Sequence, residues 1–308
     1  MEINRGIILS LAILAVVGVY FALRADLIGE PINERPAVPV RTDDFTVIVI
    51  PDTQKYSASH PEIFMNQTRW IRSVKDELNV AFVVHEGDIV DNAQDENQWR
   101  RANETMSVLD GVVPYSILPG NHDRPTGLYE RYFPAARYSG YPGYGGSHRG
   151  YSDSYHLFSR GGRDYIVLSL GYCPDNETIS WGDSVLGSHE SRKAIVVTHG
   201  FIDLDGERDV SGCDTIQYLW DGLIVKNENV FLVLSGHAHG EARRSDDAGG
   251  RTVHQLLADY QGYPEGGQGW LRLLEFSGDG KTIVVKTYSP YLGSYKTGPE
   301  SQFTLETN

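Results

Sequence analysis

Short apolar runs recur along this chain, and most of them end at a small polar motif. Runs rich in Val, Ile and Leu are typical of buried β-strands, and we predict such strands at residues 45–50, 80–84, 114–119, 164–170, 193–198 and 230–235. Apolar residues at helical spacing predict helices over His60–Leu78 and about Glu96–Leu109, between the first three strands. This alternation predicts an α/β fold with a largely parallel central sheet.

The C-terminal part of the chain has a different pattern. Thr252–Leu257, Trp270–Phe276 and Thr282–Tyr288 alternate between apolar and polar residues and follow one another closely. Ser277–Gly280 is a strong hairpin-turn signal between the last two. We therefore expect a second, antiparallel sheet region that packs on the first.

One segment lacks a clear period. Tyr138–Tyr155 holds tyrosines at positions 138, 141, 144, 151 and 155 among glycines and serines, and it predicts a long irregular loop. Such a loop is either a stiffened surface excursion or a cap over a pocket, with aromatic rings that contact a substrate.

The N-terminus carries the longest apolar run, Ile7–Leu23, between Arg5 and Arg24. We predict that residues 1–25 form an N-terminal hydrophobic helix, either a membrane anchor or a signal segment. An uncleaved anchor is favoured because Tyr20–Ala25 has no clean cleavage site. A buried core helix is disfavoured because the run has no polar face.

The prolines of residues 26–44 predict an extended tether, and residues 45–308 are expected to form one domain. The usual orientation of such an anchor places this domain outside the cytoplasm. We therefore expect a membrane-anchored extracytoplasmic protein, or a secreted one.

Composition narrows the classes of partner. The chain has 308 residues, 40% of them hydrophobic, and a net charge of -14 without a basic run, so a nucleic-acid-binding surface is not expected. Its two cysteines, Cys173 and Cys213, lack the spacing of a zinc finger or redox pair. We favour a disulfide between them, formed in an oxidising compartment, over two unpaired buried thiols.

Five polar motifs follow predicted strands, where ligands of open α/β sheets collect. They are Asp52-x-Gln54, Gly87-Asp88, Gly120-Asn121-His122-Asp123, His199-Gly200 and Gly236-His237-x-His239. Mixed oxygen and nitrogen donors fit transition metals such as Mn, Fe, Zn or Co. The donors outnumber those that one tetrahedral ion needs, which indicates two ions.

The order of these motifs resembles the calcineurin-like metallophosphoesterases, whose pattern runs D-x-H, G-D, G-N-H-D/E, H and G-H-x-H. The resemblance covers about Thr46–Leu257. It implies a four-layer α/β/β/α sandwich with two central mixed sheets. It also implies a dimetal phosphoesterase, in which a metal-bridging hydroxide attacks phosphorus.

The resemblance also implies residue roles. One ion would be held by Asp52, Gln54, Asp88 and His239, and the second by Asp88, Asn121, His199 and His237. In addition, His122 would protonate the leaving oxygen, and Asp91 would orient His122. Because Gln54 offers a hard amide oxygen, we favour Mn²⁺ over Fe or Zn²⁺.

Two positions depart from the family pattern. Gln54 replaces the usual histidine, and Asn92 stands where the protein phosphatase branch has a phosphate-binding arginine. Arg124 is a candidate substitute for that arginine, with a surface ion pair as the alternative role. The substrate therefore stays open among monoesters, diesters, cyclic nucleotides and nucleotide-sugar pyrophosphates.

Competing functions fit less well. An amidohydrolase would carry His-x-His on its first strand, and a metallo-β-lactamase needs His-x-His-x-Asp-His; neither pattern occurs here. A membrane-tethered binding module with a degenerate metal site is the alternative from a different class. The presence of a competent donor at every ligand position favours the enzyme.

Overall fold

The computed structural model describes residues 43–125, 127–208 and 213–307. The predicted N-terminal hydrophobic helix and most of the predicted tether lie outside the described residues. Within the described ranges, every helix is too short or too polar to cross a membrane.

The first sheet has the strand order β13-β12-β11-β1-β2-β3, with β14 beside β12. β1 is parallel to β2, as β2 is to β3, whereas β11 runs antiparallel to β1 on its other side. The strands are β1 (Phe45–Ile50), β2 (Val80–His85), β3 (Tyr115–Ile117), β11 (Leu271–Phe276), β12 (Thr282–Ser289), β13 (Ser294–Lys296) and β14 (Gln302–Glu306).

The second sheet has the order β4-β5-β6-β7-β8-β10-β9. Its central strands β6, β7, β8 and β10 are parallel, and β5 and β9 pair antiparallel with their neighbours. The strands are β4 (Tyr144–His148), β5 (Asp153–Arg160), β6 (Arg163–Leu170), β7 (Lys193–Thr198), β8 (Val230–Ser235), β9 (Gly240–Asp247) and β10 (Thr252–Asp259). Both sheets are therefore mixed, as the family resemblance implies.

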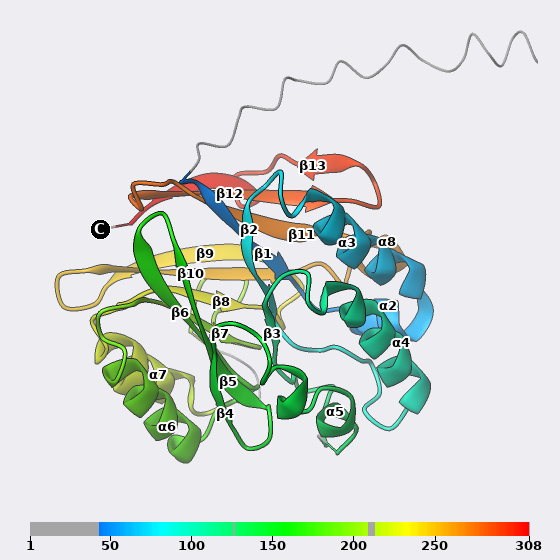
Figure 1. Ribbon diagram of the computed structural model, residues 1–308, viewed down its shortest axis with the longest axis horizontal. Helices are drawn as coiled ribbons and strands as arrows, with labels where there is room; N and C mark the ends of the chain where they lie inside the picture. Colours follow the sequence, from blue (N-terminus) through cyan, green and yellow to red (C-terminus); the bar gives the residue numbers. More distant parts are fainter. Residues whose placement is uncertain (1–42, 126, 209–212, 308) are drawn as a thin grey trace, which may run out of the picture. The chain divides into compact units, whose positions relative to one another are not determined.

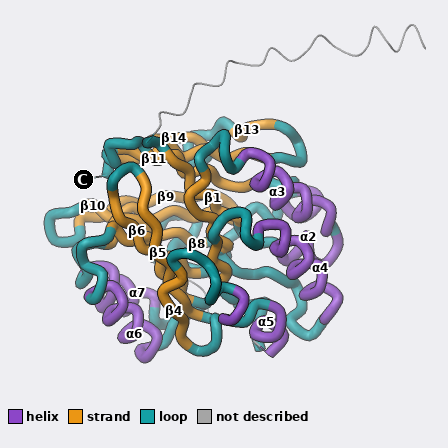
Figure 2. Tube along the Cα trace, viewed as in Figure 1, coloured by secondary structure: helices purple, strands orange, loops and turns teal. Residues whose placement is uncertain are grey.

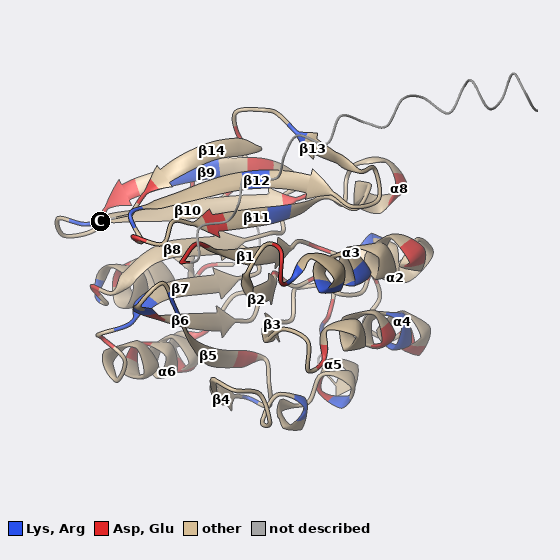
Figure 3. Cartoon of the chain, turned by 45° about the horizontal axis from the view of Figure 1, so that its top comes forward, with Lys and Arg blue, Asp and Glu red and all other residues tan. Residues whose placement is uncertain are grey.

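Helices lie beside both sheets (Figures 1 and 2). α2 (Gln54–Ser59), α3 (Pro61–Val74) and α4 (Glu96–Met106) flank the first sheet, and α6 (Asn176–Gly187) and α7 (Ile216–Leu219) flank the second. The remaining helices are η1 (Ser107–Leu109), α5 (Gly127–Tyr132), η2 (Ala135–Arg137), the π-helical η3 (Trp220–Val225) and α8 (Pro264–Gly267). In the turned view of Figure 3, acidic and basic residues are interspersed along α3, α4 and α5.

Alternation along the central strands assigns each side chain to a layer. Val47 of β1 and Ile195 of β7 belong to the core between the two sheets, whereas Ile48 and Val196 face the helices on the outside. Burying one such side chain stabilises the fold by roughly 1.5–3 kcal/mol. Three apolar layers between four structural layers produce the α/β/β/α arrangement.

Local signals fix where the helices begin. The Asp95 carboxylate accepts a hydrogen bond from Asn97 N at 3.0 Å at the start of α4, and Asp175 accepts one from Thr178 N at 3.0 Å at the start of α6. The predicted helix at His60–Leu78 begins with Pro61 and ends earlier than predicted, at Val74.

The prediction of an irregular loop at Tyr138–Tyr155 is wrong. β4 and the start of β5 form an antiparallel pair there at the edge of the second sheet. Tyr138 and Tyr151 are fully buried and stack at 3.8 Å between ring centroids. The glycines and serines interrupt the alternation of apolar and polar residues by which a strand is predicted. The rings of Tyr138 and Tyr151 are part of the core and do not cap a pocket.

The prediction of a separate antiparallel C-terminal sheet is also wrong. β10 joins the second sheet parallel to β8, whereas β11 and β12 join the first sheet next to β1. The predicted hairpin turn does connect β11 and β12. Local alternation identified the strands but carried no information on which sheet each would join.

Cys173 and Cys213 form a disulfide, with their Cα atoms 5.3 Å apart. The structure therefore confirms the predicted pairing. The bond ties the segment after β6 to the segment before α7.

Candidate metal centre

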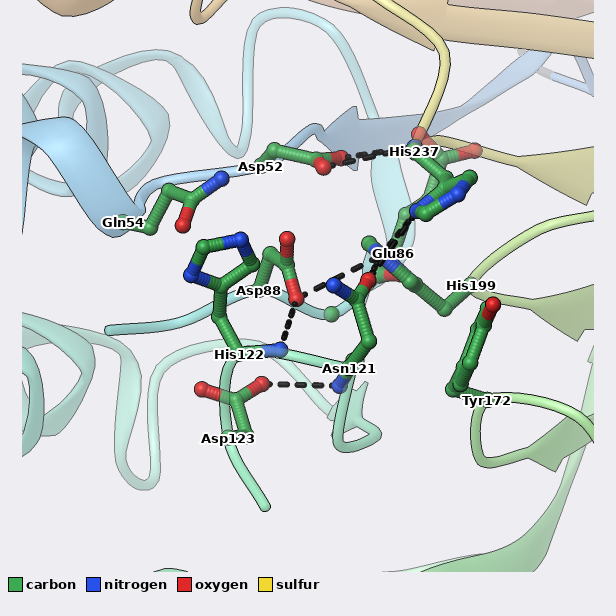
Figure 4. A network of polar contacts seen from close by, with 12 residues as sticks. Asp52, Gln54, Glu86, Asp88, Asn121, His122, Asp123, Tyr172, His199 and His237 are labelled. Atoms are coloured by element: carbon green, nitrogen blue, oxygen red, sulfur yellow. Dashed lines mark hydrogen bonds and ion pairs between the residues drawn. The ribbon is translucent and has the colours of Figure 1, made fainter. Parts of the chain in front are cut away.

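Five strand ends deliver polar side chains to one space (Figure 4). Asp52 follows β1, Asp88 follows β2 and Asn121 follows β3, all in the first sheet. His199 follows β7 and His237 follows β8 in the second sheet. The carboxyl ends of parallel strands from both sheets therefore meet at this space, as the sequence predicted.

Four of these side chains converge tightly. Asn121 Oδ1 lies 2.9 Å from His199 Nε2 and 3.0 Å from His237 Nδ1. His199 Nε2 lies 3.2 Å from His237 Nδ1 and 3.3 Å from Asp88 Oδ1. Ligands of one tetrahedral or octahedral transition-metal ion, about 2.1 Å from the metal, are separated by about 3.0–3.4 Å. The predicted ligands of the second ion thus have the spacing that an ion requires.

The tautomer of His199 supports this interpretation. Its Nδ1 lies 2.9 Å from the Glu86 main-chain oxygen, which can only accept, so the proton of a neutral ring sits on Nδ1. Nε2 then presents a lone pair to the oxygens of Asp88 and Asn121. Facing lone pairs repel one another unless a cation lies between them, so the donor set fits a metal ion.

The pKa values of His199 and His237 also favour a bound cation. Burial lowers the pKa of His237 to about 4, and neighbouring His199 adds to this effect. Burial also lowers the pKa of His199, but the Asp88 carboxylate outweighs it and raises the pKa overall. A divalent cation would replace the proton that Asp88 draws to this cluster.

Asp52 is a predicted ligand of the first ion, and it lies close to this cluster. Ligand atoms of Asp52, Asp88 and His199 all lie within 4.8 Å of one another, and all three residues are buried. Burial raises the pKa of Asp52 well above its usual value, and the Asp259 and Asp88 carboxylates raise it further. Such an accumulation of buried acid is stabilised by positive charge.

Gln54 is another predicted ligand of the first ion, and its side-chain amide oxygen is buried. Only 2% of the residue is exposed, and its Oε1 is buried without a hydrogen-bond partner among the described residues. Gln54 and Asp52 extend into the space that Asp88 enters from the opposite side (Figure 4). A buried carbonyl oxygen without a partner costs about 1–3 kcal/mol, and a bound cation would satisfy it.

His239 is the predicted ligand that the structure does not bring to the cluster. Its side chain is 58% exposed, and its Nε2 lies 3.8 Å from Asp259 Oδ2. The residue lies immediately before β9, at the rim of the site. Its assignment as a ligand of the first ion stays a prediction.

His122 lies at the mouth of the centre with a side chain that is 41% exposed. Its Nδ1 contacts the main-chain oxygen of Asp91 at 3.0 Å, whereas the Asp91 carboxylate is 3.8 Å away. That carboxylate pairs with Lys55 Nζ at 2.6 Å. In this structure the peptide carbonyl of Asp91, and not its carboxylate, makes the closer contact with the His122 ring.

Two cavities adjoin the centre and share Arg124. One, of about 320 Å³, is lined by His122, Asn121 and Asn92, and the other, of about 640 Å³, is lined by Tyr172 and Cys173. The Arg124 guanidinium donates to the Tyr172 main-chain oxygen and lies 5.5 Å from the centre of its ring. Arg124 thus lines both cavities and Asn92 lines the smaller one, and their roles in substrate binding stay predictions.

At two positions next to the metal centre, only glycine leaves room for a neighbouring carboxylate. A Cβ atom on Gly120 would lie 2.1 Å from Asp88 Oδ1, and one on Gly236 would lie 2.1 Å from Asp52 Oδ1. Asp88 and His237 themselves adopt positive φ values of 46° and 75°. Strained backbone at ligand positions is typical of functional sites.

Asp123 acts on the backbone and not on the donors. Its buried carboxylate accepts hydrogen bonds from Gly120 N at 2.8 Å and from Ile89 N and Val90 N at 3.0 Å. It therefore clamps the turn after β3 to the turn after β2. These turns carry Asn121 and Asp88.

Sequence reasoning missed three buried residues near the centre. Asp259 ends β10, so the same strand-end rule that found Asp88 could have found it. Glu86 precedes Gly87 and has a buried Oε2 without a partner among the described residues. Gln261 donates to Asp52 Oδ2 at 3.2 Å, and no sequence signal marks it.

Sequence comparison identifies a family and a relative of this chain. The profile of the calcineurin-like phosphoesterase family matches residues 45–241. The chain is 41% identical over 268 residues to the uncharacterized protein YvnB of Bacillus subtilis (strain 168), a match that covers 83% of this chain. The chain spans about a fifth (20%) of the length of that curated relative.

Solved structures share the fold. Purple acid phosphatase PPD1 from yellow lupin (Lupinus luteus) seeds superposes with a TM-score of 0.59 and 14% identity over 88% of this chain and 55% of that protein. A dimetal phosphatase from Danio rerio gives 0.54 and 15% identity over 86% and 99% of the two chains. The profile match, the relative and the strand-end motifs together show that this chain belongs to the calcineurin-like phosphoesterase family.

Proposed function

We propose that the chain is a metal-dependent phosphoester hydrolase with two divalent cations. The convergence of Asp88, Asn121, His199 and His237 carries this proposal, because these donors face one another at ligand spacing. Family membership and the buried group of Asp52, Asp88 and His199 support a dinuclear centre. Mn²⁺ is our preferred ion because Gln54 offers an amide oxygen.

Each predicted ligand has a place in this proposal. Asp52, Gln54, Asp88 and His239 hold the first ion, and Asp88, Asn121, His199 and His237 hold the second. Asp88 is shared, which fits the grouping of its carboxylate with the ligand atoms of Asp52 and His199, all within 4.8 Å of one another. For His239, binding requires its exposed side chain to turn inward from the rim.

The side chains around the centre serve the reaction. When bound, the two cations supply a nucleophile at neutral pH and neutralise the phosphoryl charge. His122 lies at the mouth, where its ring can protonate the departing alcohol oxygen. Arg124, which lines both cavities, is the proposed contact for a phosphoryl oxygen, and Asn92 lines the cavity beside His122.

Turnover of p-nitrophenyl phosphate and bis-p-nitrophenyl phosphate tests the function. The full chain with added Mn²⁺ should hydrolyse at least one of them, and Asp88→Asn should abolish turnover. The matched control is Asp183→Asn, which removes a carboxylate on α6 that pairs with Lys226. A chain that binds metal but turns over neither ester with Mn²⁺, Fe²⁺, Zn²⁺ or Co²⁺ would instead be the tethered binding module.

We also propose that the domain works outside the cytoplasm, anchored through residues 1–25 or secreted. The apolar run Ile7–Leu23 and the Cys173–Cys213 disulfide support this location. Mass spectrometry of protein from the native host should find the two cysteine peptides linked. Two thiols that alkylate freely without reductant would contradict the proposal.

A further inference from the structure

Gln261 connects both carboxylates that flank the first half of the centre. It lies two residues beyond the end of β10 and is 6% exposed. Its Nε2 donates to Asp52 Oδ2 at 3.2 Å and to Asp259 Oδ2 at 3.0 Å. Its main-chain N donates to Asp259 Oδ1 at 2.9 Å, which fixes the position of the residue itself.

These contacts determine which way the Gln261 amide points. A carboxylate beside a bound cation is ionised and only accepts hydrogen bonds, so in the metal-bound centre the NH₂ end of Gln261 must face Asp52 and Asp259. The carbonyl end then faces Gln54, and Gln261 Oε1 accepts a hydrogen bond from Gln54 Nε2. With its NH₂ group held in this way, Gln54 keeps Oε1 buried and without a partner among the described residues.

The direction of the Gln54 amide matters because its two ends are chemically opposite. The carbonyl oxygen can bind a cation, whereas the NH₂ group carries partial positive charge and repels one. The two orientations have nearly the same shape, so packing alone does not choose between them. A hydrogen-bond partner that accepts only from NH₂ does make this choice.

We propose that Gln261 is a positioning residue that orients the Gln54 amide so that Oε1 faces the first metal ion. The inference rests on the proposed dimetal function and deepens it. The two carboxylates accept hydrogen bonds from the NH₂ group of Gln261. This leaves the carbonyl oxygen of Gln261 to accept a hydrogen bond from the NH₂ group of Gln54. A histidine at position 54 would bind the ion through a ring nitrogen and has no amide group that Gln261 would need to orient.

Metal affinity tests the proposal directly. Mn²⁺ is titrated into metal-free full-length protein, and free Mn²⁺ is followed by its electron paramagnetic resonance signal. Gln261→Leu should weaken one of the two sites by about 10- to 100-fold, as is typical when a group that orients a ligand is lost. The matched control is Gln255→Leu, a fully buried glutamine of β10 that bonds Arg208 and Asp246, and it should bind like the wild type.

A double-mutant cycle separates orientation from simple loss of structure. In the Gln54→His background, the ligand is no longer an amide, so adding Gln261→Leu should weaken Mn²⁺ binding by less than about threefold. If Gln261 only holds the loop after β10 in place, the loss of affinity will be the same in both backgrounds. That result would overturn the inference.

The outcomes distinguish this inference from the proposed function. Gln54→Ala should lose one ion and keep the other. If Gln54→Ala loses an ion but Gln261→Leu binds like the wild type, the positioning role is wrong while the dimetal centre stands. If wild type, Gln54→Ala and Gln261→Leu all bind no Mn²⁺, the proposed function itself fails.

Discussion

At the scale of single residues, most of the metal-ligand set was predictable from the sequence, whereas the residues that hydrogen-bond those ligands were not. Each of the four converging donors follows an apolar strand, so sequence position was enough to predict that they lie close together. They are Asp88, Asn121, His199 and His237. His239 follows the same rule, yet its side chain is exposed at the rim. Side-chain direction in a turn depends on backbone angles that a motif does not specify.

The residues that hold the donors escaped prediction for a related reason. Gln261 acts through an amide that contacts Asp52 and Gln54, more than 200 positions away in the sequence. Contacts of such separation depend on strand order, and one sequence does not reveal strand order. Asp259 was within reach, because it is the last residue of the buried strand β10 and so marks a strand end, as Asp88 does for β2.

Removal of the His122 ring tests the proton-donor role. His122→Ala should lower kcat by roughly 10²- to 10⁴-fold for esters with poor leaving groups. Esters with good leaving groups should lose less, because they need little protonation. Metal content should stay unchanged, since the ring lies at the mouth. A variant that loses metal but keeps its specific activity per bound ion would show that His122 is not the donor.

Asp91 provides a second test at this scale. Because His122 Nδ1 contacts the main-chain oxygen of Asp91, Asp91→Ala keeps that contact and should lower kcat by less than roughly tenfold. Steady-state kinetics on the same ester panel measures the effect. A loss as large as that of His122→Ala would mean that the carboxylate, 3.8 Å away here, orients the ring during turnover.

At the scale of elements, the parallel strands were predicted well because both of their faces are buried. β1, β2, β7 and β8 are continuous apolar runs, and their predicted bounds agree with the structure within a residue. The edge strand β4 and its neighbour β5 were missed because polar residues and glycines interrupt their apolar residues, so neither contains such a run. Assignment of strands to sheets failed for β10, since pairing partners are set by tertiary packing.

The turn after β3 can be tested through Gly120. Gly120→Ala would place a Cβ 2.1 Å from Asp88 Oδ1 and 2.4 Å from Asp88 N, and the main chain cannot yield cheaply. We expect a loss of roughly 1–3 kcal/mol in the free energy of unfolding and weaker metal binding. Chemical denaturation and metal analysis measure the two effects.

Gly127→Ala is the matched control for this variant. Apart from the chain neighbours and the backbone of α5 itself, no atom of the described residues lies within 4 Å of the Cβ that this variant adds at the start of α5, so stability should not fall and metal binding should not change. Equal stability and metal content in both glycine variants would contradict the close approach of Asp88 to the β3 turn.

At the scale of the whole molecule, the buried histidine of β5 links stability to pH. Burial lowers the pKa of His156 to about 3, below its usual value near 6.5. The unfolded chain therefore takes up a proton below about pH 6.5 that the folded chain does not, and stability is lost as the pH falls from 6.5 toward 3. At pH 4.5 this one residue should cost about 2–3 kcal/mol relative to pH 7.5.

His156→Phe tests this linkage. Phenylalanine fills the same aromatic surroundings, where the His156 ring lies 5.4 Å from that of Phe82, and it does not titrate. Urea denaturation at pH 7.5 and pH 4.5 should show a smaller acid-induced loss for the variant than for the wild type. The same loss in both proteins would mean that His156 is protonated in the folded state.

The central claim is that this fold assembles two cation sites that together hydrolyse a phosphoester. The most direct measurement is the metal content of the full chain after loading with Mn²⁺ and desalting, determined beside its turnover of bis-p-nitrophenyl phosphate and p-nitrophenyl phosphate. We predict close to two ions per chain, and a rate that rises with the second equivalent and disappears in Asp88→Asn. Turnover that does not depend on bound metal, or a chain that takes up no ion, would contradict the account.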